Sequence, residues 1–402
     1  MRRVAPTWES DVTILGGCGH VGMPLGLALA DSGLQVVLYD TNYQAVDQVR
    51  SGKLPHREPG AEEVLQRALA DRRLRPTSDP ASVGESEHLI VVIGTPIDEH
   101  LNPDPQALVE ALQAVADHLV DGQLVVLRST VFPGVTRLVE RRLAELGKAV
   151  DVAFCPERIA EGRAMEELHS LPQIVAARHD DAYGRAAALF GRLTGSIVRT
   201  EPEEAELAKL FTNSYRYIKF AAANQLFMMA NDFGLDYERI RQAVISDYPR
   251  AADLPGAGFA AGPCLLKDTM QLAAFNNNNF ALGQASMQVN EGLPLYLVSR
   301  MAQRYDLESM TVGILGMAFK GESDDNRASL SYKLKRVLKA RAKAVLTSDP
   351  YVTADDELAP LDQVLARADL IVIGAPHRRY AELPITQPVV DIWNLRGAGV
   401  AL

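Results

Sequence analysis

A cysteine that follows a glycine-rich turn offers the most specific chemistry in this sequence. Cys264 comes directly after the segment Gly256–Pro263, and Lys267 and Asp268 follow it one helical turn later. If a helix begins here, its dipole and the Lys267 ammonium group both favour a thiolate, which is the nucleophilic form of cysteine. The segment therefore predicts an activated nucleophile. The alternative is a small buried cysteine after a flexible turn.

A second set of polar residues could supply acid, base and oxyanion-binding groups. Glu206, Lys209 and Asn213 share one face of a predicted helix. An ammonium group beside an amide donor can stabilise an alkoxide, although the same spacing also suits ordinary pairing on a helix surface. Glu157 follows a predicted strand and is a candidate acid or base, because a carboxylate in a crevice can be desolvated. Glu161 lies one turn later, and either acid could instead be a solvated residue at a helix start.

A glycine-rich turn near the N-terminus indicates a dinucleotide site. Its G-x-G-x-x-G pattern ends a predicted strand and opens a helix, where backbone can approach a pyrophosphate. Asp40 ends the next predicted strand and can accept hydrogen bonds from both ribose hydroxyls. Its charge would repel a 2′-phosphate and no Arg directly follows it, so NAD is favoured over NADP. Thr95 and Thr130 follow other strand ends, where they either face a ligand or simply end a strand. The residues of the turn assigned to the cofactor are Gly17, Gly19, His20, Val21 and Gly22.

The hydrophobic pattern predicts the elements that must position these residues. From Val12 onward, short apolar runs alternate with helical patterns, which predicts a parallel α/β sheet. From Glu201 a helical period continues for over thirty residues without a break, and a further helical block runs from about Cys264 to Tyr305. Strand-like runs then return. The predicted fold is α/β, with two Rossmann-like, doubly wound parallel-sheet domains (residues 1–200 and 306–402) joined by a central helical domain (residues 201–305).

Composition argues against several classes of protein. The 402 residues carry a formal net charge of −10, which argues against an extended nucleic-acid surface. Apolar runs fall far short of the roughly 20 residues that span a bilayer, so no membrane segment is expected. Three widely separated cysteines suit neither a disulfide framework nor a zinc site, and they indicate a reducing compartment, the cytoplasm. Cys18 and Cys155 are expected to pack in the core. The histidines form no HxxH or HExxH pattern, so no metal is expected.

Taken in chain order, these motifs resemble the UDP-glucose/GDP-mannose dehydrogenase superfamily, also called nucleotide-sugar 6-dehydrogenases. The resemblance covers nearly the whole chain, and seven motifs in the family's order are far more specific than any one alone. The motifs are the glycine-rich turn, Thr95-Pro96, Ser129-Thr130-Val131, Pro156-Glu157, the Glu206–Asn213 helix, the segment Gly258–Asp268, and Gly316–Lys320 followed by Asp325 and Arg327.

The resemblance implies an N-terminal NAD domain, a helical middle that forms a homodimer, and a C-terminal domain that holds a UDP-sugar. It also implies a four-electron oxidation of a C6 primary alcohol through a Cys264 thiohemiacetal and thioester. The implied NAD contacts are Asp40, Thr95, Thr130, Glu161 and Arg327. The implied catalytic residues are Glu157, Lys209, Asn213, Cys264, Lys267 and Asp268. Substrate contacts are also implied for Phe259, Gly262 and Lys320, with Arg250 reaching the substrate of a neighbouring subunit.

The residue after Pro156-Glu157 bears on the identity of the sugar. The glucose branch of the family usually has Phe there, whereas this chain has Arg158 and resembles the N-acetylhexosamine branch. This predicts a UDP-N-acetylhexosamine substrate, with UDP-N-acetylmannosamine first and UDP-glucose as the alternative. Arg158 could instead pair with Glu157 or Glu161 and carry no information on the sugar. A catalytically silent NAD- or nucleotide-binding regulator is the alternative of a different class.

Overall fold

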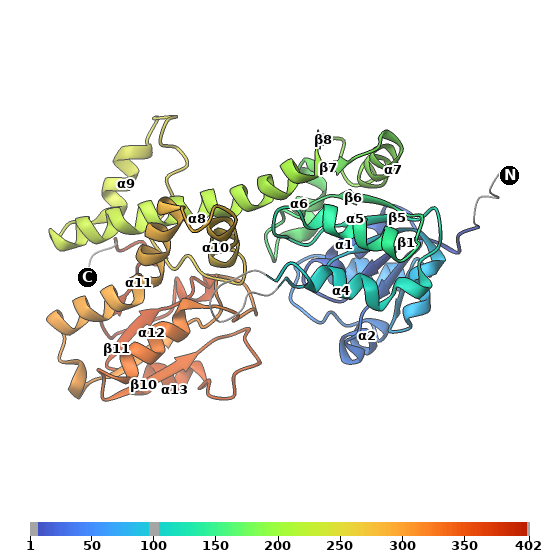
Figure 1. Ribbon diagram of the computed structural model, residues 1–402. Coiled ribbons are helices and arrows are strands. Elements are labelled where there is room, and N and C mark those ends of the chain that lie inside the picture. Colours follow the sequence, from blue (N-terminus) through green and yellow to red (C-terminus); the bar gives the residue numbers. More distant parts are fainter. Residues whose placement is uncertain (1–6, 96–103, 400–402) are drawn as a thin grey trace. The chain divides into compact units, whose positions relative to one another are not determined.

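The computed structural model describes residues 7–95 and 104–399 of the chain. Pro96, of the predicted Thr95-Pro96 pair, lies outside the described residues. The chain forms two compact units, residues 1–211 and residues 212–402. The boundary between them falls within one long helix, α8 (Pro202–Asp232), which confirms the uninterrupted helix predicted from Glu201 onward (Figure 1).

The N-terminal unit is built on an eight-stranded sheet in the order β3-β2-β1-β4-β5-β6-β7-β8. Strands β1 to β6 are parallel, as predicted, and they have the order of a doubly wound dinucleotide-binding sheet. Strand β7 differs, because it pairs antiparallel to β6 through Ala153 and Ala177. The strands are β1 (Ser10–Leu15), β2 (Val36–Tyr39), β3 (Leu74–Thr77), β4 (Ser86–Val91), β5 (Leu124–Leu127), β6 (Asp151–Phe154), β7 (Gln173–Ala177) and β8 (Ile197–Thr200).

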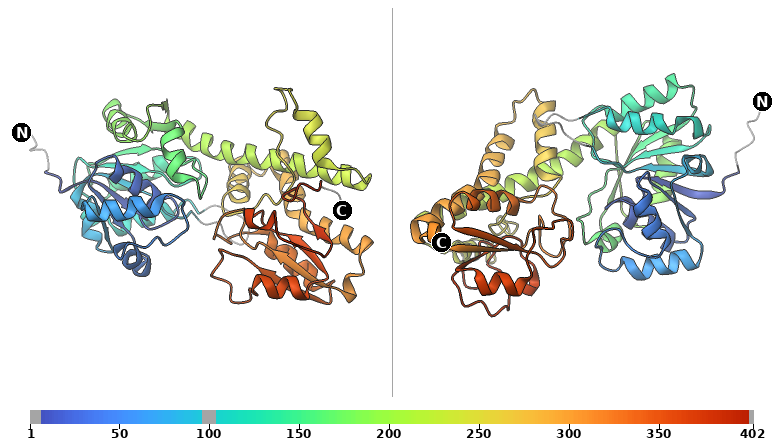
Figure 2. Two further views of the ribbon diagram at one scale, coloured as in Figure 1. Left: turned by 180° about the vertical axis from the view of Figure 1, so that it is seen from behind. Right: turned by 90° about the horizontal axis from the view of Figure 1, so that it is seen from below.

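Helices cover both faces of this sheet (Figure 2). Ile14 and Leu15 are neighbours on β1 and belong to different cores, because side chains alternate between the faces of a strand. One core includes α1, α3, α6 and α7, and the other includes α4 and α5. The helices are α1 (Gly22–Asp31), α2 (Tyr43–Arg50), α3 (Ala61–Ala70), α4 (Ala107–Ala114), α5 (Val135–Glu145), α6 (Ala164–Ser170) and α7 (Asp180–Phe190), with 3₁₀ turns at Pro80–Glu85 and Ala116–His118.

The C-terminal unit contains a smaller parallel sheet in the order β10-β9-β11-β12. The helical block predicted from Cys264 to Tyr305 is two helices, α10 and α11, separated by a turn in which Asn277 and Asn278 have left-handed backbone. The strands are β9 (Thr311–Leu315), β10 (Ala344–Ser348), β11 (Leu370–Ile373) and β12 (Val389–Val390). The helices are α9 (Tyr237–Ile245), α10 (Leu265–Phe275), α11 (Ala281–Arg304), α12 (Leu330–Lys339) and α13 (Leu361–Arg367), with 3₁₀ turns at Leu307–Ser309 and Arg378–Tyr380.

The helical middle of the chain shares one hydrophobic core with this second sheet. Phe227 of α8, Leu297 of α11, Ile314 of β9 and Leu334 of α12 all belong to the same buried cluster. The helices from Thr212 to Arg304 therefore fold together with the C-terminal sheet as one unit. Across residues 7–95 and 104–399, no helix combines the length and apolar character needed to cross a bilayer.

Glu206 anchors the first turns of α8 to the N-terminal sheet. Its carboxylate is fully buried and accepts hydrogen bonds from the backbone N–H of Gly134 (2.6 Å) and from the backbone N–H (2.8 Å) and hydroxyl (2.6 Å) of Thr136. These N–H groups lie at the start of α5, where a helix leaves donors without internal partners. Burial raises the pKa of Glu206, and the three hydrogen bonds oppose that shift. Glu206 therefore caps α5.

Replacing Glu206 with Gln should lower the free energy of unfolding by about 1–3 kcal/mol, because one acceptor oxygen becomes an NH₂ group that faces buried donors. Glu203→Gln is a matched control on the same helix, since Glu203 ion-pairs with Arg178 and is partly exposed to solvent. The control should cost no more than about 1 kcal/mol. Urea unfolding followed by circular dichroism measures both losses, and equal losses would contradict the assigned role of Glu206.

Candidate active site

The glycine-rich turn has the close backbone approach that a pyrophosphate site requires. Strand β1 ends at Leu15 and α1 begins at Gly22, with Val21 at the N-cap position. A Cβ at Gly22 would lie 2.3 Å from the carbonyl oxygen of Gly16, so no larger residue fits. Because β1 lies between β2 and β4, the turn is at the point where the strand order reverses, and ligands bind there in open α/β sheets.

Asp40 lies where the sequence predicts it, directly after β2 and beside the glycine-rich turn. One carboxylate oxygen accepts a hydrogen bond from the backbone N–H of Cys18 at 3.0 Å, and the other accepts one from Asn42 at 2.9 Å. Cys18 is buried, and burial together with the Asp40 charge raises the pKa of its thiol to about 12. Burial also raises the pKa of Cys155 to about 12. Both thiols are therefore packed in the core, as predicted, and their raised pKa values favour the neutral form.

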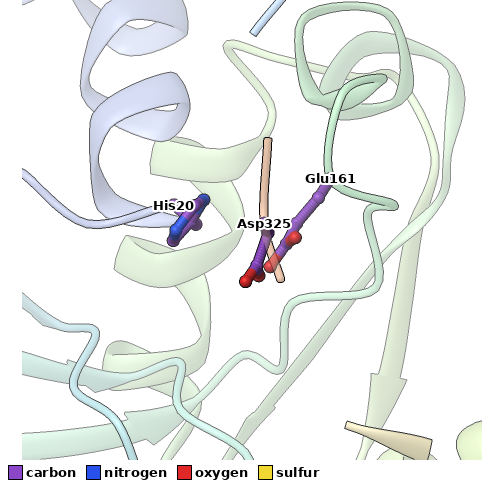
Figure 3. A group of neighbouring side chains, drawn as sticks. All are labelled: His20, Glu161 and Asp325. Carbon is purple, nitrogen blue, oxygen red and sulfur yellow. The ribbon is translucent and has the colours of Figure 1, made fainter. Parts of the chain in front are cut away.

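His20 and Glu161, two predicted NAD contacts, lie close together in the N-terminal unit. A carboxylate oxygen of Glu161 is within 4.8 Å of a ring nitrogen of His20 (Figure 3). The His20 ring also stacks on His56, with ring centroids 3.6 Å apart. Figure 3 also labels Asp325, which belongs to the C-terminal unit. No sequence motif includes His56, because only the fold brings its loop to the glycine-rich turn.

Thr95 and Thr130 lie on two loops that are joined directly. The Thr95 hydroxyl donates to the backbone carbonyl of Thr130 at 2.7 Å. The Ser129 hydroxyl accepts from the N–H of Ile93 at 2.8 Å and donates to the carbonyl of Ile93 at 2.9 Å. These loops follow β4 and β5, the next two strands after β1 in the sheet order. The predicted cofactor residues of the N-terminal unit thus gather at the carboxyl edge of one sheet.

Glu157 is held by a partner that the sequence did not reveal. The guanidinium of Arg128, fully buried at the end of β5, donates to the Glu157 carboxylate through Nε at 2.9 Å and through a second, shorter bond. The other carboxylate oxygen accepts from the backbone N–H groups of Arg158 (2.7 Å) and Ile159 (3.0 Å). The sequence does place an Arg directly after the apolar run LVVL, and a charged residue at the end of a predicted buried strand could have indicated a buried partner. Both oxygens of Glu157 are therefore already engaged by donors.

The Arg158 side chain is directed to the protein backbone. Its guanidinium donates to the carbonyl oxygen of Pro172. Burial lowers the pKa of Arg158, and the neighbouring Glu157 charge opposes that shift. The sequence suggested Glu157 or Glu161 as the partner of the Arg158 side chain, whereas the structure shows the Pro172 carbonyl. This hydrogen bond uses one of the guanidinium donors that a sugar could otherwise use.

The C-terminal unit brings Asn213, Asp268 and Lys267 together. Asp268 is fully buried, and one carboxylate oxygen accepts from the Asn213 amide nitrogen at 2.5 Å. The Lys267 ammonium nitrogen lies 3.6 Å from the other oxygen. Lys209 lies one turn before Asn213 on α8 and is also buried. A buried carboxylate is therefore joined to an amide and an ammonium group, as the predicted chemistry requires.

Cys264 lies at the start of α10, as predicted. It is the N-cap residue of that helix, and its carbonyl oxygen accepts from the backbone N–H of Asp268 at 2.8 Å. Of the chain's three cysteines, all within the described residues, Cys264 alone is exposed. The thiol is thus accessible at the positive end of a helix and one turn from a buried carboxylate.

The segment before Cys264 packs on the loop that carries Lys320. Gly262 has a positive φ of +100°, and a Cβ there would lie 2.6 Å from the Phe319 ring, so the position requires glycine. Phe259 is buried, with its ring against Trp393 at a centroid distance of 6.0 Å. The predicted substrate residues of the C-terminal unit, Phe259, Gly262 and Lys320, therefore belong to adjoining segments.

Two predicted arginines differ in how they are held. Arg327 donates through Nε to Asp325 at 2.9 Å, and Asp325 is buried. Arg250 lies in the loop after α9, with its guanidinium carbon 5.7 Å from the centre of the Tyr248 ring. Arg250 is exposed, so its side chain is accessible to a ligand or a partner.

Three family models match consecutive segments of the chain. All belong to the UDP-glucose/GDP-mannose dehydrogenase family: its NAD binding domain matches residues 10–193, its central domain residues 203–292 and its UDP binding domain residues 313–396. The UDP-N-acetyl-D-mannosamine dehydrogenase of Pyrococcus horikoshii is 30% identical over 377 residues, covering 90% of this chain and 89% of that protein. The UDP-glucose 6-dehydrogenase of Haloferax volcanii is 29% identical over 394 residues, covering 91% of each.

Solved structures have the same fold along nearly the whole chain. A UDP-glucose dehydrogenase from Pyrobaculum islandicum matches with a TM-score of 0.88 and 29% identity, covering 99% of this chain and 98% of that one. The UDP-N-acetylmannosamine dehydrogenase structure from Pyrococcus horikoshii matches with a TM-score of 0.87 and 27% identity, covering 96% of each. With its dinucleotide turn and its three matched domains, the chain belongs to the UDP-glucose/GDP-mannose dehydrogenase family and is an NAD-dependent oxidoreductase.

Proposed function

We propose that this enzyme oxidises the C6 primary alcohol of a UDP-N-acetylhexosamine to a carboxylate through a covalent Cys264 intermediate. One observation carries the proposal: the single exposed cysteine begins α10 one turn from the buried, hydrogen-bonded Asp268. A thiol acting in this way must stay reduced. None of the three cysteines, all within the described residues, is in a disulfide, which supports the cytoplasmic location that we also propose.

The N-terminal unit has the groups that would hold NAD. The close backbone at Gly22 fits a pyrophosphate, and Asp40 at the end of β2 suits the ribose hydroxyls. Thr95 and Thr130 lie at the same edge of the sheet. NAD bound there would supply the hydride acceptor for each of the two oxidations, one NAD molecule for the alcohol and a second for the thiohemiacetal.

Lys209 of α8 and residues of the C-terminal unit would carry the remaining steps. Asp268 accepts the C6 hydroxyl proton, directly or through a water, during the first oxidation. The Cys264 thiol then adds to the aldehyde carbon, and its proton passes to the aldehyde oxygen. The resulting thiohemiacetal loses a hydride, which the second NAD molecule would accept, and releases its hydroxyl proton to water to give a thioester. Water attacks the thioester carbonyl, the C–S bond breaks, and the carboxylate and the free thiol are released while Asp268 takes the proton. Lys209 and Asn213, one turn apart on α8, donate to each oxyanion, a role worth on the order of 3 kcal/mol per donor.

The hydrogen bonds of the two carboxylates favour Asp268 over Glu157 as the base. Both oxygens of Glu157 accept from Arg128 or from backbone N–H groups. Asp268 accepts one hydrogen bond from Asn213, and its second oxygen is an ion-pair partner of the Lys267 ammonium group at 3.6 Å. We therefore assign Glu157 to holding the loop after β6.

The choice of sugar rests on the relatives more than on the hydrogen bonds of the Arg158 side chain. The Arg158 guanidinium is already bonded to the Pro172 carbonyl. The relatives from Pyrococcus horikoshii and from Methanococcus maripaludis, at 30% and 27% identity, are UDP-N-acetyl-D-mannosamine dehydrogenases. UDP-N-acetylmannosamine is therefore the first candidate, UDP-N-acetylglucosamine the second and UDP-glucose the third.

A panel of these three UDP-sugars tests the assignment. We expect kcat/KM for UDP-N-acetylmannosamine to exceed that for UDP-glucose by about tenfold or more, because a site built for an acetamido group leaves polar groups unpaired around a hydroxyl. Initial rates of NADH formation measure the ratio. A preference for UDP-glucose would reject the sugar assignment and leave the dehydrogenase chemistry standing.

Cys264→Ser should trap the covalent intermediate. A serine hydroxyl can add to the aldehyde, but an oxygen ester hydrolyses more slowly than a thioester, so a sugar adduct should accumulate. Intact-mass spectrometry after addition of NAD and the UDP-sugar detects it. Cys264→Ala is the matched control, which should bind NAD normally, form no adduct and produce no acid. Continued acid formation by the alanine variant would remove the thioester route.

We further propose that a second copy of the chain docks on the exposed apolar face of α8 and α9. Leu226 and Met229 of α8 and Phe233, directly after it, are exposed, and Ile240 and Val244 of α9 line the same groove. These residues line a groove of about 280 Å³. An apolar patch of this kind on a soluble enzyme is typical of a subunit interface. The exposed Arg250 follows α9 in the chain and could reach a neighbouring subunit's substrate.

The oligomeric state tests this interface. Phe233→Glu combined with Met229→Glu should convert a dimer into a monomer, because two charges would be buried without partners. Light scattering coupled to size-exclusion chromatography measures the mass. Tyr43→Glu, an equally exposed aromatic site on α2 of the N-terminal unit, is the control and should remain dimeric. A monomeric wild type, or a dimer that survives both glutamates, would contradict the proposal.

A further inference from the structure

A buried histidine joins two loops at the carboxyl end of the second sheet. His377 follows β11 and is fully buried. Its Nδ1 accepts a hydrogen bond from the backbone N–H of Glu322 at 2.9 Å, so the ring proton must be on Nε2 when the imidazole is neutral. Nε2 lies 3.1 Å from a carboxylate oxygen of Asp349 and donates to it. Both ring nitrogens are therefore used.

Asp349 extends the connection to the loop after β9. The oxygen that faces His377 also accepts from the backbone N–H groups of Met317 (2.6 Å) and Ala318 (3.0 Å). Its other oxygen accepts from Tyr351 at 2.8 Å. Burial opposes ionisation, but the His377 hydrogen bond and the backbone donors outweigh it and hold the pKa of Asp349 at about 2. Asp349 is therefore a carboxylate at neutral pH.

These bonds fix the segment from Met317 to Glu322 on both sides of Lys320. Asp349 holds the first two residues and His377 holds the last. The sheet order β10-β9-β11 places this segment where the strand order reverses, and ligands bind at the carboxyl ends of the strands at such points. An ammonium group on a flexible four-carbon stem has no preferred geometry of its own, so its reach depends on the backbone that carries it.

We propose that His377 and Asp349 are positioning residues that hold the Lys320 backbone for the diphosphate of the UDP-sugar. The proposal rests on the proposed function, since it assumes a UDP-linked substrate. Neither residue takes part in the chemistry at Cys264. Loss of the His377 hydrogen bonds should therefore weaken binding of UDP and of the UDP-sugar in the same proportion and leave kcat nearly unchanged, the pattern of a lost uniform binding interaction.

His377→Phe is the most direct variant. It keeps an aromatic ring between Tyr351 and Tyr380, whose rings lie 5.1 and 5.5 Å from that of His377, but it removes both hydrogen bonds. We expect the Kd for UDP, measured by calorimetry, and the KM for the UDP-sugar to rise about tenfold or more. His377→Asn can keep an acceptor near Nδ1 and His377→Gln a donor near Nε2, so each should give a smaller loss. The Kd for NAD should not change.

Tyr380→Phe is the matched control. The Tyr380 ring packs on His377, and within residues 7–95 and 104–399 its hydroxyl has no hydrogen-bond partner, so this variant should bind UDP as the wild type does. A wild type that neither binds UDP nor oxidises UDP-sugars would reject the proposed function itself. A wild type that binds UDP, with folded His377 variants that bind it within twofold, would overturn the positioning role alone. If the Phe variant does not fold, the Asn and Gln variants decide the question by the same twofold limit.

Discussion

The buried Asp268 carboxylate is the constraint on which the candidate active site depends. An ionised group without solvent contact is destabilising by several kcal/mol unless it is paired and hydrogen-bonded. Asn213 on α8 and Lys267 on α10 supply those partners. The pairing fastens the two helices to each other and thereby fixes where α10 begins. Since Cys264 is the N-cap residue of α10, the position of the thiol follows from the compensation of a buried charge.

Three further loops are also held by hydrogen bonds to a buried charged side chain. Glu206 binds the turn before α5, Arg128 binds Glu157 after β6, and Asp349 binds the loop after β9. In each case a buried charged group accepts from or donates to a loop that carries a predicted functional residue or adjoins one. Parallel sheets collect such loops at one edge, and the buried hydrogen bonds make their arrangement rigid. Burying these charged groups costs free energy, and the hydrogen bonds that offset this cost also hold the site residues in place.

Local pattern was sufficient to predict much of this arrangement. The predicted helix from Glu201 onward is α8, Pro202–Asp232, and Cys264 starts a helix because its successors have helical spacing and no strand pattern. What could not be predicted depends on contacts between distant residues. Glu206 and Gly134 are 72 positions apart, and Arg128 and Glu157 are 29 apart. The sequence pattern of β7 is that of any buried strand, so its antiparallel direction is set by the connection and not by its residues.

We propose that the enzyme retains the aldehyde on Cys264, and a trapping experiment on the wild-type enzyme distinguishes a retained aldehyde from a released one. A limiting amount of UDP-sugar is converted with excess NAD in the presence and absence of a hydrazine that captures free aldehydes. We expect two NADH for each sugar under both conditions and no hydrazone, because in the proposed mechanism Cys264 holds the aldehyde until it becomes a thioester. One NADH for each sugar, or hydrazone formed in proportion to the sugar consumed, would contradict it.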